Sequence, residues 1–200
     1  MENPGTALTF DFTSGAIAHR LKFGGGRNQA LPKAAGFSRG RTPQIVDATA
    51  GLGRDAFLLA SLGAEVTLIE RSPQVHASLS DALLRANSGP AEIAEITARM
   101  TLLSGDARHV LGNLEAEVIL VDPMHPPRQG SALVKKEMRL LRDLVGADPD
   151  ALELMQVALK VATNRVVLKW PLRADPLQGL QPPSHQIVGK TTRYDVFMRL

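Results

Sequence analysis

The sequence predicts an α/β protein with a mostly parallel, doubly wound sheet of seven strands, an antiparallel C-terminal edge and a short N-terminal hairpin. Three observations predict this fold. Short apolar runs that suit buried strands alternate with longer amphipathic segments that suit helices. The first of these runs leads into a turn of small residues, Gly51-Leu52-Gly53, which then opens a helix. Two β-rich segments at the C-terminus follow one another without a helix, as in an antiparallel pair.

Residues 1–43 are predicted to form an N-terminal unit, with a hairpin at 7–12 and 17–22 followed by a basic loop. Between Asp11 and Asp47 the sequence holds no acidic residue but six basic ones. These are Arg20, Lys22, Arg27, Lys33, Arg39 and Arg41. Such a loop can follow a phosphate backbone, and an ordinary solvated surface explains the same charges about equally well.

The main domain is predicted over residues 44–200 as one compact unit. Its first strand, 44–46, precedes the glycine turn and a helix at about 55–62. The second strand, 65–70, is followed by a helix at about 73–86. Strands that alternate with helices pair in parallel, so their C-terminal ends meet at one edge of the sheet.

The rest of the domain continues this alternation. A loop rich in small residues precedes the third strand, and a proline-rich surface loop at 171–183 precedes the last two strands. The fourth strand, 118–121, is apolar at every position, which indicates burial on both faces. The remaining strands are expected at 101–104, 118–121, 165–170, 186–190 and 194–200, and the remaining helices at about 132–145 and 149–161.

Acidic side chains stand at the ends of four predicted strands, as Asp47, Glu70, Asp106 and Asp122. Because these strand ends meet, we expect the four side chains to face one ligand. Glu70 lies nineteen positions after Gly51, which suits the hydroxyl groups of a ribose. Asp106 can accept a hydrogen bond from an adenine amino group. The glycine turn alone fits NAD as well as S-adenosylmethionine (SAM), and capping of a turn or helix is the structural alternative for Asp47 and Asp106.

The sequence Asp122-Pro123-Met124 forms a proline-fixed turn directly after a buried strand. The lone pair of an exocyclic amine on a nucleobase is delocalised into the ring, so the amine attacks a methyl donor poorly until acceptors hold its protons. Asp122 and a backbone carbonyl of the Pro123 turn can supply these acceptors, and no strong base is then required. We find no residue placed to face a nicotinamide. The turn therefore favours SAM, with Asp122 and Pro123 as catalytic candidates, although an Asp that only caps its turn is the structural alternative.

Several blocks of the sequence resemble the J-type family of bacterial small-subunit ribosomal RNA methyltransferases, which methylate the N2 atom of a guanine in 16S RNA. The blocks are Asp11-Phe12, Ala18-His19-Arg20, residues 22–27, residues 46–57, Glu70-Arg71, Asp122-Pro123-Met124, residues 131–139 and residues 166–169. The resemblance covers nearly the whole chain. It implies a Rossmann-like SAM-dependent methyltransferase fold, SAM as the cofactor and S-adenosylhomocysteine (SAH) as the product.

The resemblance also implies which residues contact the cofactor. These are Arg54, Asp55, Glu70, Arg71, Asp106, Ala107 and Asp122, to which the strand-end argument adds Asp47, Gly51 and Gly53. The helix dipole alone would also favour an acid at Asp55. His19 and Lys169 belong to matching blocks and are weaker candidates. The structural alternatives are a histidine packed at the core edge and a lysine that only ends a strand beside Trp170.

Four residues are predicted to contact the substrate, namely Arg27, His125, Lys135 and Lys136. The basic residues can follow a phosphate backbone. Relatives usually carry an aromatic residue where His125 stands, and a neutral imidazole stacks on a flipped base less extensively than a phenyl ring. Relatives also usually carry a further segment before the Asp11-Phe12 block.

Composition sets the outer limits of these predictions. The 200 residues are 44% hydrophobic, include no cysteine and carry a net charge of +3, which suits one domain with a full core. No apolar run is long enough to cross a bilayer, and no secretion signal is present. The lack of cysteine excludes thiolate metal sites, and the five histidines lack the spacing of a zinc helix. We therefore expect a cytoplasmic protein without a metal or a membrane segment.

These features predict an enzyme that transfers a methyl group from SAM to the N2 atom of a guanine in 16S ribosomal RNA, as naked RNA or within the small ribosomal subunit. The target base must leave its stack to reach the site. One alternative is an amino-methyltransferase that acts on DNA adenine or a small molecule. Another is a non-catalytic RNA-binding ribosome assembly factor that keeps the fold, and an NAD-dependent dehydrogenase is the third.

Overall fold

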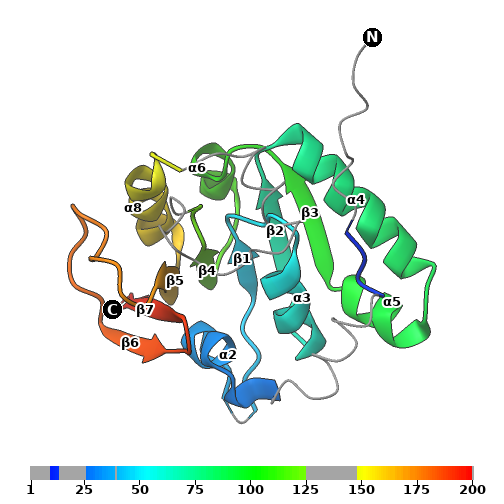
Figure 1. Ribbon diagram of the computed structural model, residues 1–200, viewed down its shortest axis with the longest axis horizontal. Coiled ribbons are helices and arrows are strands. Elements are labelled where there is room, and N and C mark those ends of the chain that lie inside the picture. Colours follow the sequence, from blue (N-terminus) through cyan, green and yellow to red (C-terminus); the bar gives the residue numbers. More distant parts are fainter. Residues whose placement is uncertain (1–9, 14–25, 39, 125–147, 200) are drawn as a thin grey trace.

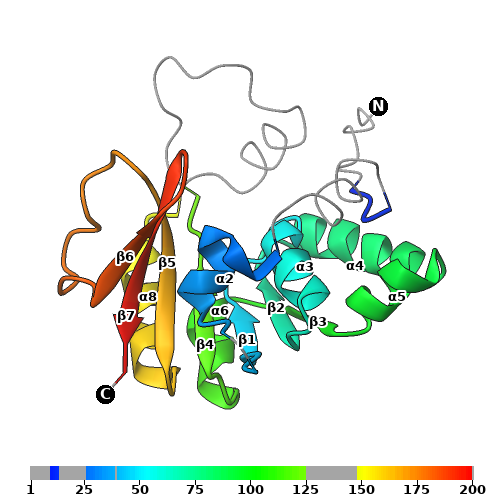
Figure 2. The same cartoon turned by 90° about the horizontal axis from the view of Figure 1, so that it is seen from below.

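The computed structural model describes residues 10–13, 26–38, 40–124 and 148–199 (Figure 1). Within these residues the chain forms a seven-stranded sheet in the order β3-β2-β1-β4-β5-β7-β6. Figure 2 shows this order across the molecule, from β6 at one edge to β3 at the other. The strands are β1 (Ile45–Asp47), β2 (Val66–Glu70), β3 (Met100–Ser104), β4 (Val118–Val121), β5 (Arg165–Pro171), β6 (His185–Val188) and β7 (Thr192–Met198).

The strand directions confirm the predicted mixed sheet. Strands β3, β2, β1, β4 and β5 pair in parallel, whereas β7 pairs antiparallel with both β5 and β6. Every residue of β1 and β4 is buried, as expected for apolar strands at the centre of a sheet covered on both faces. Asp47, the last residue of β1, pairs with Leu68 of β2 and Leu120 of β4. It therefore lies in the middle of the edge where the parallel strands end.

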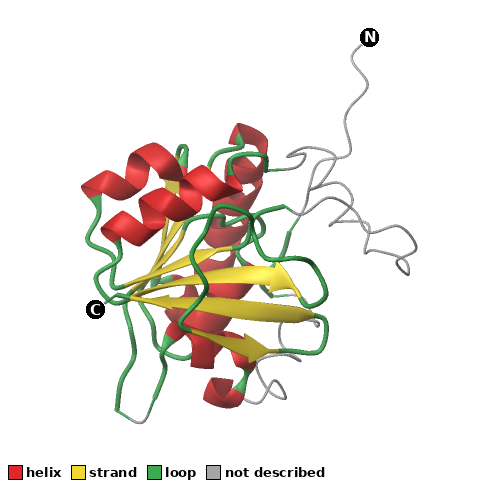
Figure 3. Cartoon of the chain, turned by 90° about the vertical axis from the view of Figure 1, so that its left-hand side faces the viewer, coloured by secondary structure: helices red, strands yellow, loops and turns green. Residues whose placement is uncertain are grey.

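Helices cover both faces of this sheet (Figure 3). They are η1 (Gly26–Asn28), α2 (Ala30–Ala35), α3 (Arg54–Ser61), α4 (Pro73–Asn87), α5 (Ala91–Thr97), α6 (Ala107–Val110), η2 (Leu111–Asn113) and α8 (Ala151–Val161). Helices α2 to α5 share one apolar cluster with the sheet, which includes Leu59 and Leu79. Residues of α6, η2 and α8 share a second cluster, which includes Leu111 and Met155. The molecule thus has two apolar layers with the sheet between them.

The helix that follows β2 begins where the sequence indicates. Ser72 precedes α4, and its hydroxyl oxygen accepts a hydrogen bond from Val75 N at 3.4 Å. Pro73 occupies the first turn, where its missing N–H costs no hydrogen bond. The cap and the proline together fix the end of the turn after Glu70, which lines the site described below.

Three predictions of local structure are wrong. The loop of small residues before β3 contains α5, because Ile93 and Ile96 bury apolar surface in the first cluster. The basic loop contains α2, which ends at Gly36 with a φ of +90°. Residues 10–12 form no strand, and Phe12 instead stacks on Phe57 at a ring-centroid distance of 4.9 Å. The rest of the predicted hairpin and the predicted helix at 132–145 lie outside the described residues.

The described part of the N-terminal unit packs on the main domain. Helix α2 lies against β6 and β7, and Leu31 belongs to the first apolar cluster. The Arg27 guanidinium donates hydrogen bonds to the carbonyl oxygens of Ser38 at 2.9 Å and Leu62 at 3.2 Å. It also lies over the ring of Phe37, 5.3 Å from the centroid. The division of the chain after residue 43 stays a prediction.

Gly53 provides a test of how the glycine turn is built into this fold. Its φ is +67°, and a Cβ there would meet Leu79 Cδ1 at 3.0 Å and Phe12 Cζ at 3.3 Å. We expect Gly53→Ala to lower the free energy of unfolding by about 1–3 kcal/mol, because alanine disfavours left-handed backbone. Urea denaturation followed by circular dichroism measures the change. Gly112→Ala is the matched control, since a Cβ there has no neighbour within 4 Å, and equal losses in the two variants would contradict this account.

Candidate functional site

A cavity of about 280 Å³ lies at the C-terminal ends of β1, β2 and β4, where α3, α6 and α8 begin. All of the residues predicted to hold the cofactor or to act in catalysis line it except Gly53 and Pro123. Those that line it are Asp47, Gly51, Arg54, Asp55, Glu70, Arg71, Asp106, Ala107 and Asp122. A Cβ at Gly53 would meet core side chains, and Pro123 is buried. The cofactor and catalytic roles of these residues stay predictions.

Glu70 joins the two turns that form one wall of the cavity. One carboxylate oxygen, Oε2, accepts a hydrogen bond from Gly51 N at 2.9 Å, and Oε1 accepts one from Ser72 N at 2.7 Å. Burial raises the pKa of Glu70, and the two backbone donors oppose that rise. Each oxygen keeps a further lone pair, so the side chain can still accept hydrogen bonds from ligand hydroxyl groups.

Asp47 and Thr49 connect the end of β1 to the end of β4. Asp47 is 3% exposed, and its Oδ1 accepts a hydrogen bond from Thr49 N at 3.1 Å. The hydroxyl of Thr49 accepts one from Asp122 N at 2.7 Å. Burial raises the pKa of Asp47 to about 7, and the nearby charges of Asp55 and Asp122 add to the rise.

Lys169 of β5 lies between two of these acidic side chains, which argues against the structural alternative of a lysine that only ends its strand. Its Nζ donates hydrogen bonds to Asp55 Oδ2 at 2.6 Å and to Asp122 Oδ2 at 2.7 Å. The two carboxylates raise the pKa of Lys169 well above its ordinary value, against the effect of burial. A charged residue inside the apolar run 166–170 is the sequence signal that could have identified it.

Asp122 faces the cavity from the end of β4. Its side chain is 40% exposed, so a ligand in the cavity can reach it. Burial of the carboxyl group against the protein nevertheless raises the pKa of Asp122. The charges of Asp55 and Asp148 add to this rise, and the charge of Lys169 opposes it. Among the described residues, its Oδ2 atom bonds Lys169. Asp122 therefore has one carboxylate oxygen held by Lys169 and a side chain that a ligand in the cavity can reach.

Asp106 has both of the roles that the sequence suggested as alternatives, because it caps α6 and also lines the cavity. Its Oδ1 accepts a hydrogen bond from Arg108 N at 2.9 Å. The guanidinium of Arg108 pairs with its carboxylate, with Nη2 and Oδ2 2.6 Å apart, and lowers the pKa of Asp106 to about 2. Arg108 also pairs with Glu153 of α8 and so joins α6 to α8.

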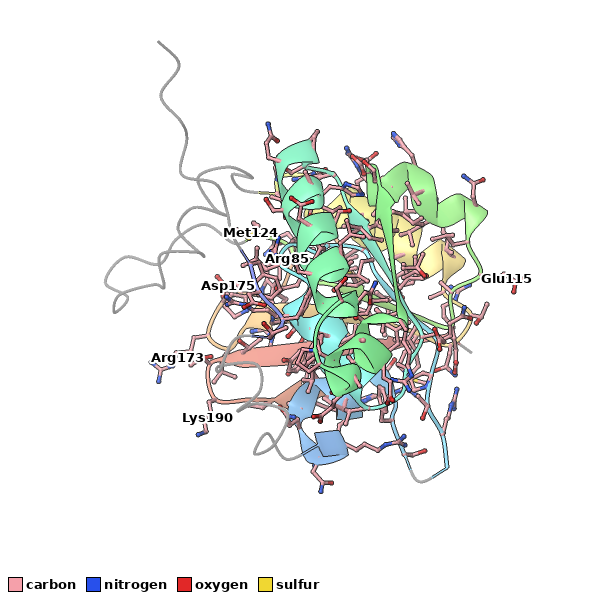
Figure 4. The ribbon with its side chains drawn as sticks, turned by 90° about the vertical axis from the view of Figure 1, so that its right-hand side faces the viewer. Arg85, Glu115, Met124, Arg173, Asp175 and Lys190 are labelled. Carbon is pink, nitrogen blue, oxygen red and sulfur yellow. The ribbon has the colours of Figure 1, made fainter. Side chains whose placement is uncertain are left out.

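A second arginine closes the neighbouring part of the rim. Arg71 pairs with Asp148 and, at 2.8 Å, with Asp150. Met124 N donates a hydrogen bond to Asp148 Oδ2 at 2.6 Å, so the two ends of the segment 125–147 are joined. The segment itself, with the predicted substrate residues His125, Lys135 and Lys136, lies outside the described residues. Figure 4 shows Met124, which follows β4, on the opposite side of the molecule from Glu115, which precedes that strand.

The cavity suits a nucleoside that carries a positive charge. Ile69, Ala107 and Leu154 supply apolar surface for a flat base, next to carboxylates that can accept hydrogen bonds from hydroxyl and amino groups. The carboxylates of Asp55 and Asp122 outnumber the single ammonium group of Lys169 that they bond, and Asp47 adds negative charge when it is ionised. This excess of negative charge favours a cationic ligand.

The described residues show neither a metal centre nor a membrane-spanning helix. No group of three or more histidine, cysteine, aspartate or glutamate side chains there could hold a metal ion. The helices in that part of the chain are all too short or too polar to cross a bilayer.

Comparisons with known proteins agree with this chemistry. The model of a family described as "Putative SAM-dependent methyltransferase" matches residues 1–199. "Ribosomal RNA small subunit methyltransferase J" of Agrobacterium fabrum is 66% identical over 198 residues, which cover 99% of this chain and 95% of that protein. The protein of the same name from Chromohalobacter salexigens is 54% identical, over 97% of this chain and 77% of its own. The crystal structure of a SAM-dependent methyltransferase from Neisseria gonorrhoeae is 36% identical, with a TM-score of 0.72 and coverage of 95% and 74%.

The raised pKa of Asp47 predicts how the free energy of unfolding depends on pH. Between the ordinary pKa of 3.8 and about pH 7, the folded protein holds a proton that the unfolded chain has released. Stability should therefore fall as the pH rises through this window and stay low above it. Asp47→Asn carries no such proton and keeps an acceptor for Thr49 N. We expect this variant to exceed the wild type at about pH 8 by up to about 4 kcal/mol, and to match it near pH 4.

Urea denaturation at several pH values measures this difference. Asp81→Asn, which changes an exposed aspartate on α4, is the matched control and should show the same pH dependence as the wild type. A stability difference for Asp47→Asn that does not change between pH 4 and pH 8 would show that Asp47 is ionised in the fold at low pH.

Proposed function

Because the chain belongs to the family of SAM-dependent methyltransferases, we propose that it methylates the exocyclic N2 atom of a guanine in 16S ribosomal RNA of the small ribosomal subunit. The observation that carries this proposal is the 66% identity, over 99% of the chain, to a protein named as a small-subunit ribosomal RNA methyltransferase. The amine as acceptor is supported by the position of Asp122 beside the cavity. Such a substrate would place the enzyme in the cytoplasm, as the sequence leads us to expect.

The residues that would hold SAM line different walls of the cavity. Glu70 would accept hydrogen bonds from the ribose hydroxyls, and Asp106 and Ala107 would lie on the adenine side. Asp47 and Gly51, which line the cavity as well, would lie near the amino acid portion. When bound, SAM supplies an electrophilic methyl group on a positively charged sulfur, and SAH remains after transfer. The excess of carboxylates favours the charged donor over the neutral thioether product.

Asp122 would act on the substrate amine. As an anion it accepts a hydrogen bond from one N–H, which directs the nitrogen lone pair toward the methyl group. It would also stabilise the positive charge that develops on nitrogen as the new N–C bond forms and the bond from sulfur to the methyl carbon breaks. The proton that nitrogen then loses would pass to solvent, directly or by way of this carboxylate. Pro123 fixes the turn that follows, and the bond from Asp122 N to Thr49 holds the start of that turn. The geometry thus performs the reaction by orientation and charge, without a strong base.

Basic residues support an RNA substrate. Arg173 and Lys190 are exposed, and Figure 4 shows both on the same side of the molecule as Met124. Side chains of this kind can contact the phosphates that flank an extruded base. Lys135, Lys136 and His125 remain predicted substrate contacts. Arg27 is a predicted contact as well, although its guanidinium already bonds three backbone carbonyls and Thr42.

Methyl transfer from labelled SAM tests the proposed function directly. We expect label in 16S RNA, as N2-methylguanine after nuclease digestion and mass spectrometry, with naked RNA and small subunits assayed separately. Asp122→Asn should lower kcat about 10²- to 10³-fold, because a neutral amide stabilises the developing charge poorly. Asp81→Asn, on the exposed face of α4, should leave kcat unchanged.

Each alternative substrate or role gives a different result in the same assay. Label in DNA or in small amines, with none in RNA, would overturn the substrate. Binding of SAM and RNA without any methylated product would indicate an assembly factor. Tight binding of NADH in calorimetry, with no binding of SAM, would contradict the cofactor as well.

A further inference from the structure

We propose that Lys169 is a positioning residue for methyl transfer, which holds one oxygen of Asp122 and so directs the other oxygen toward the substrate amine. This inference rests on the proposed function and adds to it a residue on β5. The Nζ of Lys169 lies 2.7 Å from Asp122 Oδ2 and 2.6 Å from Asp55 Oδ2. One ammonium group thus joins the first turn of α3 to the end of β4.

The sheet itself places Lys169 at this point. Leu168 pairs with Val121, the last residue of β4, so the next residue along β5 lies level with Asp122. Leu168 and Trp170 both pack in the second apolar cluster. Because successive side chains of a strand point to opposite faces, Lys169 points to the other face, where Asp55 lies in the first turn of α3.

The contacts determine what Lys169 can do. A lysine whose pKa is raised by two adjacent carboxylates stays protonated, so it donates hydrogen bonds and does not act as a base. Its Nζ separates two carboxylates that would repel each other, and it holds both at their Oδ2 atoms. The contact holds the Oδ2 atom of Asp122 in place, and the charge of Lys169 opposes the rise in the pKa of Asp122. Lys169 therefore favours the anion, the state that accepts a hydrogen bond from an amine.

The groups that face Asp122 come from four elements. Lys169 lies on β5, Asp55 in the first turn of α3, Asp47 at the end of β1 and Asp148 just before α8. Only Lys169 among these four is positive. Loss of its charge should therefore raise the pH at which Asp122 becomes protonated, and the acid limb of the kcat profile should move to higher pH.

The lack of cysteine in this chain permits a sharp test of that charge. In the full-length protein, Lys169→Cys introduces a single thiol, which 2-bromoethylamine converts to an aminoethyl side chain close to lysine in length. Iodoacetamide converts the same thiol to a neutral amide side chain of similar length. Mass spectrometry confirms one addition, and wild-type protein treated in parallel controls for other reactions.

We expect the free cysteine form and the amide form to lose kcat about 10- to 100-fold, because a misdirected acceptor disturbs the attack geometry. The acid limb of kcat should move to higher pH in both forms. The aminoethyl form should recover most of the activity and the original limb. The KM for SAM should change less than kcat, since the effect falls on the substrate amine. Lys160→Cys, at an exposed lysine of α8, is the matched control and should be indifferent to all three treatments.

Equal kcat values for the aminoethyl and amide forms would overturn the inference, and so would an acid limb that stays in place when the charge is removed. If the cysteine variant does not fold, Lys169→Arg and Lys169→Gln give the same comparison of charged and neutral side chains. Failure of the proposed function is distinct, because wild-type protein would then methylate no RNA at all. Wild-type activity together with unaffected Lys169 variants would contradict this inference alone.

Discussion

The site depends on a balance of charge at the end of the sheet. Carboxylates from β1, α3 and β4 converge there, and Lys169 from β5 supplies the ammonium group that bonds two of them. A group of buried like charges is stable only when it is protonated, paired or bound to a cation. All three ways of neutralising charge apply here. Asp47 has a raised pKa, and Asp55 and Asp122 pair with Lys169. The cofactor SAM carries a positively charged sulfur. The group of carboxylates that the fold must neutralise thus also favours a cationic ligand.

The fold holds this group of charges through backbone contacts and ion pairs. Glu70 bonds the backbone of two turns, and Thr49 bonds the backbone at Asp122. Around the rim, Arg108 joins α6 to α8, while Arg71 joins the end of β2 to the residues before α8. Contacts of this kind restrict the movement of the cavity walls, and restricted walls lower the cost of orienting the reacting groups.

Much of this arrangement could be predicted from the sequence, because apolar runs reveal strands and the rule for parallel strands brings their ends together. The convergence of Asp47, Glu70, Asp106 and Asp122 on one cavity follows from those two facts. The pairs that join distant segments could not be predicted in this way. Lys169 lies 47 positions from Asp122, and no local pattern shows that β5 is the neighbour of β4.

Helices α5 and α2 are among the elements that the sequence did not predict, for a physical reason. Helix α5 follows Pro90 and consists mostly of small and polar residues, so its local pattern resembles a loop. The burial of Ile93 and Ile96 against the sheet supplies the stability that the segment lacks alone. The short helix α2 similarly depends on its packing against β6 and β7. Tertiary contacts therefore decided the structure where local propensity was weak.

A crystal structure of this protein with SAH and a guanine nucleotide would test the central claim most directly. We predict that the adenosine portion of SAH lies between Glu70 and Asp106, with the sulfur atom of SAH on the side of Asp122. The guanine amino group should contact one carboxylate oxygen of Asp122 while Lys169 holds the other. SAH bound outside this cavity would contradict the account, and so would a guanine amino group that approaches SAH from a direction remote from Asp122.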